Sequence, residues 1–325
     1  MKTTSRPTVV TITDRNYVLA VYILIASLRY HRVDCRINVL GVNLSAGEKR
    51  LLEQFADTAV IDGETSNSGN AATRKAEAIL SARDHDTDFI TLLDGDCIVT
   101  GDITPYLSPD RPGIMSRLKT PCEDADVFRD HYGAEERQGG VPENILEIWR
   151  RDVGERQESA IQNTVIGGNL TIHRDHLGFV ERWQTQMREV LPSTDPGMAY
   201  DYDSVGYFQM DESVLNSLLA FSHEAPPRLD YLFNQDKEAY VAHLGPGKPR
   251  FWELWRFDRL RYHPQIMRIL EWARREGHDL PELPWTLRPL NKPFVYLGAC
   301  AHQLRELARR TTRLMLRDVR RLLAS

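Results

Sequence analysis

Two aspartates separated by a single glycine, Asp94 and Asp96, directly follow a short apolar run. Carboxylates placed in this way at the end of a strand can both bind one hard divalent cation, because the glycine lets the backbone approach the ion closely. An isolated Asp-Gly-Asp segment is more often an ordinary turn between strands. The choice between a metal site and a turn therefore depends on which other residues could join these two.

His243 and Lys248 are the strongest additional candidates, and they lie close together in the segment HLGPGKP. Alone, His243 is an ordinary strand-end histidine and Lys248 is a solvated loop lysine. Beside two aspartates, an imidazole becomes a candidate third ligand and a lysine becomes a candidate partner for phosphate. One imidazole among oxygen ligands suits Mn²⁺ better than Ca²⁺, with Mg²⁺ as the alternative.

Other acidic residues have a structural alternative to a chemical role. Asp14 could cap the helix that follows it, and Asp211 could cap the helix that begins near Glu212. A second Asp-x-Asp pair, Asp201 and Asp203, follows no apolar strand. We therefore interpret that pair as an acceptor-side or structural loop rather than as a metal site.

The elements that must position these residues alternate between strand and helix over the first 93 residues. β-branched runs predict the strands, and apolar residues at helical spacing predict the helices. The expected strands are 8–13, 36–42, 58–62 and 88–93, and the expected helices are 17–30, 45–55 and 71–82. This alternation predicts an α/β fold with a doubly wound, mainly parallel sheet. Such sheets bind ligands at the carboxyl ends of their strands, where Asp14 and Asp94 fall.

The remainder of the chain is less regular. Residues 109–158 are rich in charge, glycine and proline, and we expect long loops with short helices that could act as a lid. Further on we expect strands over 169–173 and 239–244, and helices over 175–190 and 212–221.

Six segments, in order along the chain, resemble the retaining glycosyltransferases of the GT-A fold, in the family of bacterial lipopolysaccharide galactosyltransferases and glycogenin. The segments are Thr13–Tyr17, Thr73–Ala76, Leu93–Val99, Ile166–Ile172, Asp211–Asn216 and His243–Pro249. The resemblance covers roughly residues 8 to 255. Three departures stand out: His243 and Gly245 are one residue closer together than in the family, Ile166 replaces an Asn, and Glu212 replaces a Gln.

The resemblance implies a metal-dependent transferase that moves a hexose from a nucleotide sugar, typically UDP-hexose, to a glycan, lipid-linked or small-molecule acceptor. Asp94, Asp96 and His243 would hold Mn²⁺ or Mg²⁺, which neutralises the diphosphate leaving group. The implied donor contacts are Asp14 and Asn16 at the base, Arg74 between the donor and the carboxylates, and Asp94, Gly245 and Lys248 at the diphosphate. Asp211 and Glu212 would be the catalytic residues. The implied domains are a catalytic GT-A domain over 1–255 and a basic helical extension over 256–325.

Three other functions are weighed against this one. An inverting transferase or a sugar-nucleotide pyrophosphorylase also places carboxylates at the strand ends of a doubly wound sheet. A pyrophosphorylase needs a glycine-rich basic loop near its N-terminus, and Thr11–Tyr17 has none. A nucleotide-binding scaffold without turnover is the alternative from a different class, and donor hydrolysis would distinguish it.

Charge is distributed unevenly over the 325 residues, whose net charge is −5. From Pro246 onward, 17 Lys and Arg stand against 8 Asp and Glu, a balance of +9, so the first 245 residues carry −14. The acidic body argues against nucleic acid as a partner. Four scattered cysteines and the lack of a long apolar run predict a reduced, cytoplasmic protein. The basic helix expected over 301–325 either packs on the catalytic domain or attaches the protein peripherally to an anionic inner-membrane face.

Overall fold

The computed structural model describes residues 5–63, 71–124, 140–190, 206–230, 240–245 and 250–324. The chain forms two compact units, residues 1–241 and 242–325, and each is described by itself. The sequence predicts that the catalytic domain ends at residue 255. This boundary stays a prediction.

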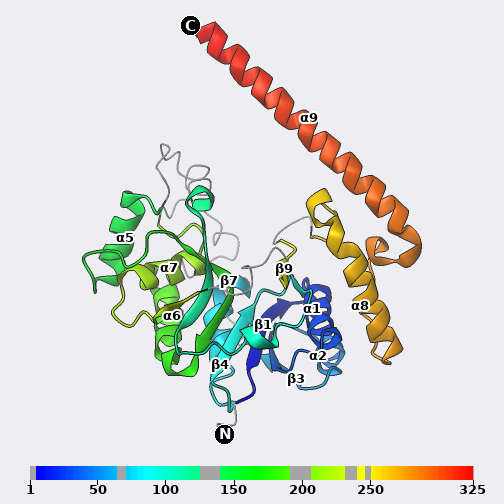
Figure 1. The fold of residues 1–325 in the computed structure, drawn as a ribbon, viewed down its shortest axis with the longest axis horizontal. Helices are drawn as coiled ribbons and strands as arrows, with labels where there is room; N and C mark the ends of the chain where they lie inside the picture. Colours follow the sequence, from blue (N-terminus) through cyan, green and yellow to red (C-terminus); the bar gives the residue numbers. More distant parts are fainter. Residues whose placement is uncertain are drawn as a thin grey trace. The chain divides into compact units, whose positions relative to one another are not determined.

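A β-sheet forms the centre of the first unit (Figure 1). It has seven strands, in the order β3-β2-β1-β4-β7-β6-β8. Its strands are β1 (Thr8–Asp14), β2 (Arg36–Val42), β3 (Thr58–Asp62), β4 (Phe89–Leu93), β6 (Ile114–Leu118), β7 (Val165–His173) and β8 (Arg228–Leu229). β7 runs antiparallel to both of its neighbours, and the other pairs are parallel. The predicted α/β fold with a mainly parallel sheet is confirmed.

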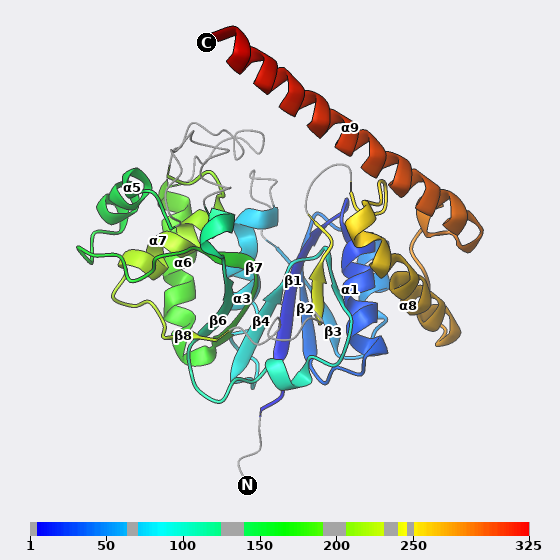
Figure 2. The ribbon, with the colours of Figure 1, turned by 45° about the horizontal axis from the view of Figure 1, so that its top comes forward.

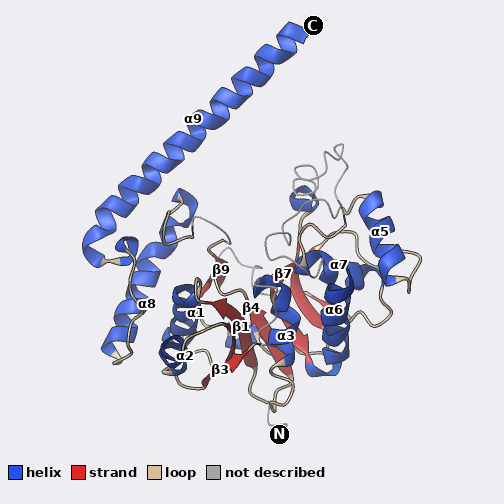
Figure 3. Ribbon diagram, turned by 180° about the vertical axis from the view of Figure 1, so that it is seen from behind, coloured by secondary structure: helices blue, strands red, loops and turns tan. Residues whose placement is uncertain are grey.

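Helices cover both faces of this sheet (Figures 2 and 3). The helices of the first unit are α1 (Val18–Tyr30), α2 (Ala46–Glu53), α3 (Lys75–Leu80), α5 (Glu143–Val153), α6 (Leu177–Val190) and α7 (Asp211–Phe221). The connections through α1 and α2 step from β1 outward to β3, and the connection through α3 steps back to β4. Right-handed crossovers therefore place α3 on the opposite face from α1 and α2. Such a reversal of strand order creates a ligand-binding crevice at the carboxyl ends of the strands.

The segment 109–158, for which we expect long loops with short helices, contains the helix α5 and also a strand, β6, that the sequence did not predict. In α5, Ile145, Trp149 and Val153 are buried at intervals of four residues, so one side of the helix faces the core. Many charged residues around this stripe hid the periodicity in the sequence. Strand β7 likewise begins at Val165, four residues earlier than expected, because two glycines that resemble a turn belong to the strand.

The second unit is helical and contains α8 (His263–Arg275) and α9 (Lys292–Ala324). Short 3-10 helices cover Phe257–Tyr262, Trp285–Leu287 and Pro289–Asn291. Its buried apolar side chains include Ile266, Ile269 and Leu270 of α8. Among the described residues, no helix is both long and apolar enough to cross a membrane.

Candidate active site

The turn after β4 carries the two aspartates that the sequence singled out. The Asp94 N–H donates to the Gly168 carbonyl oxygen at 2.8 Å, and the Cys97 N–H donates to the Asp94 carbonyl at 3.0 Å. A Cβ on Gly95 would lie 2.9 Å from the carbonyl oxygen of Ile12 in β1. Glycine is therefore needed between the aspartates because the turn packs directly against a neighbouring strand.

The three predicted metal ligands form a group that could hold a metal ion. Asp94, Asp96 and His243 each offer one ligand atom, and these atoms lie within 4.8 Å of one another. Asp96 is buried, whereas His243 is the exposed last residue of β9 (Val241–His243). Two carboxylates and one imidazole are a donor set that suits Mn²⁺ or Mg²⁺.

Lys75, at the start of α3, lies between two carboxylates of the site. Its Nζ is 3.1 Å from Asp94 Oδ1 and 3.0 Å from Asp211 Oδ2. Burial lowers the pKa of Lys75, but the charges of Asp211 and Asp94 outweigh it and raise the pKa above its usual range, so the ammonium stays charged. Burial raises the pKa of Asp211 to about 6, against the opposing effect of Lys75.

The family resemblance predicts that Arg74 lies between the donor and the carboxylates, whereas the described contacts to Asp94 and Asp211 come from Lys75. The Arg74 guanidinium instead binds Glu77 in a bidentate pair, with both N–O distances at 2.7 Å. Lys75 belongs to the same matched segment, Thr73–Ala76, and was missed because the family pattern contains an arginine there. The role of Arg74 toward a donor stays a prediction.

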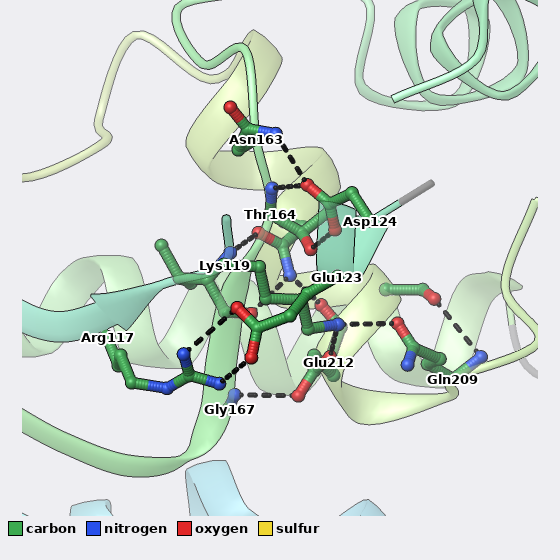
Figure 4. Close-up of polar contacts among 12 residues, drawn as sticks. Arg117, Lys119, Glu123, Asp124, Asn163, Thr164, Gly167, Gln209 and Glu212 are labelled. Atoms are coloured by element: carbon green, nitrogen blue, oxygen red, sulfur yellow. Dashed lines mark hydrogen bonds and ion pairs between the residues drawn. The ribbon is translucent and has the colours of Figure 1, made fainter. Parts of the chain in front are cut away.

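Glu212, in the first turn of α7, has both carboxylate oxygens engaged (Figure 4). Oε1 is 2.5 Å from Lys119 Nζ, and Oε2 accepts a hydrogen bond from the Gly167 N–H at 2.9 Å. The helix begins at Asp211 and its N-cap position is Met210, so Asp211 is not the capping residue. Lys119 lies 93 residues before Glu212 in a charge-rich segment, and no sequence signal distinguishes it from a surface lysine.

Two adjacent glycines of β7 bring this helix and the aspartate turn close together. A Cβ on Gly168 would lie 2.0 Å from Asp94 Oδ2, and a Cβ on Gly167 would lie 3.4 Å from the Glu212 Cβ. The Asn216 side chain then fixes α7 to β7, because its Oδ1 accepts from the Val165 N–H at 2.7 Å and its Nδ2 donates to the Val165 carbonyl at 3.0 Å. The sheet thus brings residues near positions 94, 167 and 212 into one site.

The remaining predicted residues lie at the end of β1 and after β9. The Asp14 carboxylate accepts a hydrogen bond from the Asn16 N–H at 2.8 Å, which forms a local turn rather than a helix cap. Gly245 has a φ of +101°, a conformation that favours glycine. Lys248, and the Asp201–Asp203 segment, lie outside the described residues.

Comparison with known proteins identifies the fold. No protein-family model matches the chain, and no curated protein matches it. Among solved structures, the bifunctional glycosyltransferase WbbM is 13% identical with a TM-score of 0.52, over 88% of this chain and 51% of that one. The glycosyltransferase GlyE of Streptococcus pneumoniae TIGR4 is 15% identical with a TM-score of 0.49, over 86% of this chain and 66% of that one.

The galactosyltransferase LgtC, solved with donor and acceptor sugar analogs, is 15% identical with a TM-score of 0.45, over 85% of this chain and 98% of that one. The present chain therefore spans about half to two thirds of the length of WbbM and GlyE. The sheet order, the antiparallel β7 and the likeness to WbbM agree on a glycosyltransferase fold of the GT-A type. At these identities the likeness concerns the fold.

Proposed function

We propose that this protein is a metal-dependent retaining glycosyltransferase that transfers a hexose from a nucleotide sugar, UDP-hexose, to an acceptor hydroxyl. One observation supports this most strongly. Lys75 joins the aspartate turn after β4 to the acidic start of α7, so that a candidate metal group and two candidate catalytic carboxylates share one site. A buried ammonium is costly unless it is paired, so Lys75 is held by the carboxylates of these two distant segments.

Asp94, Asp96 and His243 would hold Mn²⁺ or Mg²⁺, and a divalent ion there supplies charge neutralisation for the departing nucleoside diphosphate. Lys248 adds a second positive charge for the β-phosphate, and Gly245 lets the backbone approach it closely. The uracil edge binds at the end of β1, where Asp14 accepts and Asn16 donates hydrogen bonds. Arg74 contacts the donor phosphate or sugar.

Glu212 is placed to stabilise positive charge that develops at the anomeric carbon. A fixed carboxylate lowers the energy of an oxocarbenium-like centre when its orientation is set before the reaction. The hydrogen bonds to both of its oxygens favour this electrostatic role over nucleophilic attack, because a nucleophile must free an oxygen. Retention then results from attack by the acceptor on the face that the diphosphate leaves.

The test is calorimetric titration of UDP in the presence of Mn²⁺ into the wild-type protein and into Asp96→Ala and His243→Ala. We expect both variants to remain folded and to lose the Mn²⁺-dependent part of the binding. The matched control is Asp102→Ala, which removes another aspartate of the same region, one whose carboxylate accepts a hydrogen bond from the Thr104 N–H. Unchanged UDP affinity in both ligand variants would contradict the metal site.

The acceptor is a glycan, a lipid-linked sugar or a small molecule, and the second unit supports a location at a membrane surface. Leu297 and Leu304 of α9 are 67% and 68% exposed, and Arg305 and Arg309 lie in the same stretch of the helix. Apolar and basic side chains on one helix favour binding to anionic lipid headgroups. We infer that the protein acts in the cytoplasm, peripherally at the inner face of the membrane.

A further inference from the structure

Lys119 is a buried lysine to which the proposed chemistry gives no role beyond its contact with Glu212. It directly follows β6 and is 7% exposed. Its Nζ contacts two side chains of one short segment, Gln209 Oε1 at 3.1 Å and Glu212 Oε1 at 2.5 Å (Figure 4). A buried ammonium is costly unless such partners satisfy it, so its position is specified by the turn that it contacts.

The segment from Gln209 to Glu212 is a tight turn with an unusual backbone. Met210 has a φ of +45° and a ψ of −112°, a combination that non-glycine residues rarely adopt. Its N–H donates to the Tyr207 carbonyl at 2.8 Å, and the Glu212 N–H donates to the Gln209 carbonyl at 3.1 Å. A backbone of this kind persists only where its surroundings hold it, and it occurs often at active sites.

The two contacts of Lys119 lie on either side of the strained residue. Gln209 comes directly before Met210, and Glu212 comes two residues after Met210. One ammonium group therefore contacts both ends of the turn. The end of this turn carries the two carboxylates of the site. Asp211 contacts Lys75, and Glu212 accepts a hydrogen bond from the Gly167 N–H. Arg117 lies nearby but is bound to Glu123, with N–O distances of 2.9 and 3.0 Å, so it does not share this arrangement.

We propose that Lys119 is a positioning residue that clamps the strained turn Gln209–Glu212 and thereby fixes the two catalytic carboxylates, Asp211 and Glu212. Its catalytic significance rests on the proposed function, since it acts through these two residues. The clamp has two consequences. It holds the Glu212 carboxylate in one orientation, and it balances the charge of that carboxylate locally without using the metal.

Trp183 provides a readout of the clamp that does not depend on activity. Its buried indole N–H donates to the carbonyl oxygen of Asp211 at 3.1 Å, so the indole resonance reports where the start of α7 lies. In ¹H–¹⁵N spectra of the full-length protein, the signal is assigned by its loss in Trp183→Phe. We expect Lys119→Met to shift or broaden this signal and Lys119→Arg to preserve it.

The matched control is Lys49→Met, because Lys49 forms an ion pair of the same length, 2.5 Å, with Asp62 at the edge strand β3. We expect it to leave the Trp183 signal unchanged. In the donor-transfer assay, Lys119→Met should lower kcat about 100-fold, the loss typical of a displaced catalytic group, with little change in KM for the donor. Lys119→Arg keeps the positive charge and should retain most of the wild-type rate. If Lys119 acted only by packing, the larger guanidinium would not be expected to retain it.

A second pair of variants covers the case in which Lys119→Met does not fold because Glu212 is left as an unpaired buried charge. Glu212→Gln keeps an oxygen for Lys119, whereas Lys119→Met with Glu212→Gln removes the clamp and leaves no unpaired charge. We expect the Trp183 signal near its wild-type position in the single variant and displaced in the double variant. An unchanged Trp183 signal in the folded clamp variants would overturn the proposal. Absence of transfer in the wild type would instead contradict the proposed function. The Trp183 signal would still test the clamp in that case, because it does not depend on activity.

Discussion

At the scale of single residues, the burial of Asp211 makes the stability of the protein depend on pH. Burial raises the pKa of Asp211 to about 6, above the value of about 3.9 for an aspartate in an unfolded chain. The folded state therefore binds this proton more tightly than the unfolded state. Its contribution to stability is fully present below the unfolded pKa and is lost as the pH rises through about 6.

We expect this pH dependence to appear when the wild type is compared with Asp211→Asn, because the asparagine side chain does not titrate. The Tm of the wild type relative to the variant should be higher at about pH 4 than at about pH 7.5. Thermal unfolding without metal measures both values. A Tm difference that stays constant across this range would show that Asp211 has an ordinary pKa in the folded state.

Glu212 gives a second prediction at this scale. If its fixed charge and hydrogen bonds stabilise the transition state, Glu212→Gln should retain measurable transfer with the same product configuration. Glu212→Ala should be slower by about 10²–10³-fold, because it removes both the charge and the hydrogen-bonding oxygen. Steady-state rates and NMR of the product measure these outcomes. A glycosyl adduct on Glu212 detected by mass spectrometry, together with an inactive Gln variant, would establish double displacement instead.

At the scale of elements, Asp124 connects the segment after β6 to the start of β7. Its buried carboxylate accepts hydrogen bonds from the Thr164 N–H at 2.9 Å, the Thr164 hydroxyl at 2.5 Å and the Asn163 amide at 3.0 Å (Figure 4). This connection matters for the site because β7 carries Gly167, whose N–H binds Glu212. Asp124 was not singled out in the sequence, where it stands in a charge-rich stretch.

We expect Asp124→Ala to lower the free energy of unfolding by about 2 kcal/mol or more, because buried donors lose their acceptor. The neighbouring Glu123→Ala is the matched control. Glu123 pairs with Arg117 and accepts hydrogen bonds from Thr120 at a partly exposed position, so its loss should cost less than the loss of the buried Asp124 carboxylate. Urea unfolding of the three proteins gives the comparison. Equal losses for the two variants would mean that Asp124 does not hold β7.

The same elements show how far the sequence predicts the structure. β1 to β4 are contiguous apolar and β-branched runs, so pattern and turn residues were sufficient to place them and the strand-end aspartates. β6 was missed because it is short and lies between charged, proline-rich stretches, where local pattern is a weak signal. The contacts of Lys75 and Lys119 depend on which segments the sheet brings together, which a linear pattern does not contain.

At the scale of the whole molecule, acidic and basic residues are separated along the chain. The first 245 residues carry −14, and the rest carry +9. An acidic surface is repelled by anionic lipid, whereas a basic helix with exposed leucines is attracted to it. Phe294, Leu297, Leu304 and Leu307 of α9 are all exposed and recur at spacings of three and seven residues, which return to the same side of a helix. This distribution is the reason that we propose membrane contact through the second unit.

We therefore expect the full-length protein to sediment with vesicles that contain phosphatidylglycerol and not with pure phosphatidylcholine vesicles. About 0.5 M salt should release the protein, because salt screens the electrostatic attraction. Replacing Leu297, Leu304 and Leu307 together with serine should weaken binding more than about tenfold, since each buried leucine contributes about 1.5 kcal/mol or more. The matched control is Leu118→Ser, which removes an exposed leucine of β6, 42% exposed, in the first unit and should leave sedimentation unchanged. Equal sedimentation of the triple variant and the wild type would contradict membrane contact through α9, because the exposed leucines would then contribute nothing to the binding.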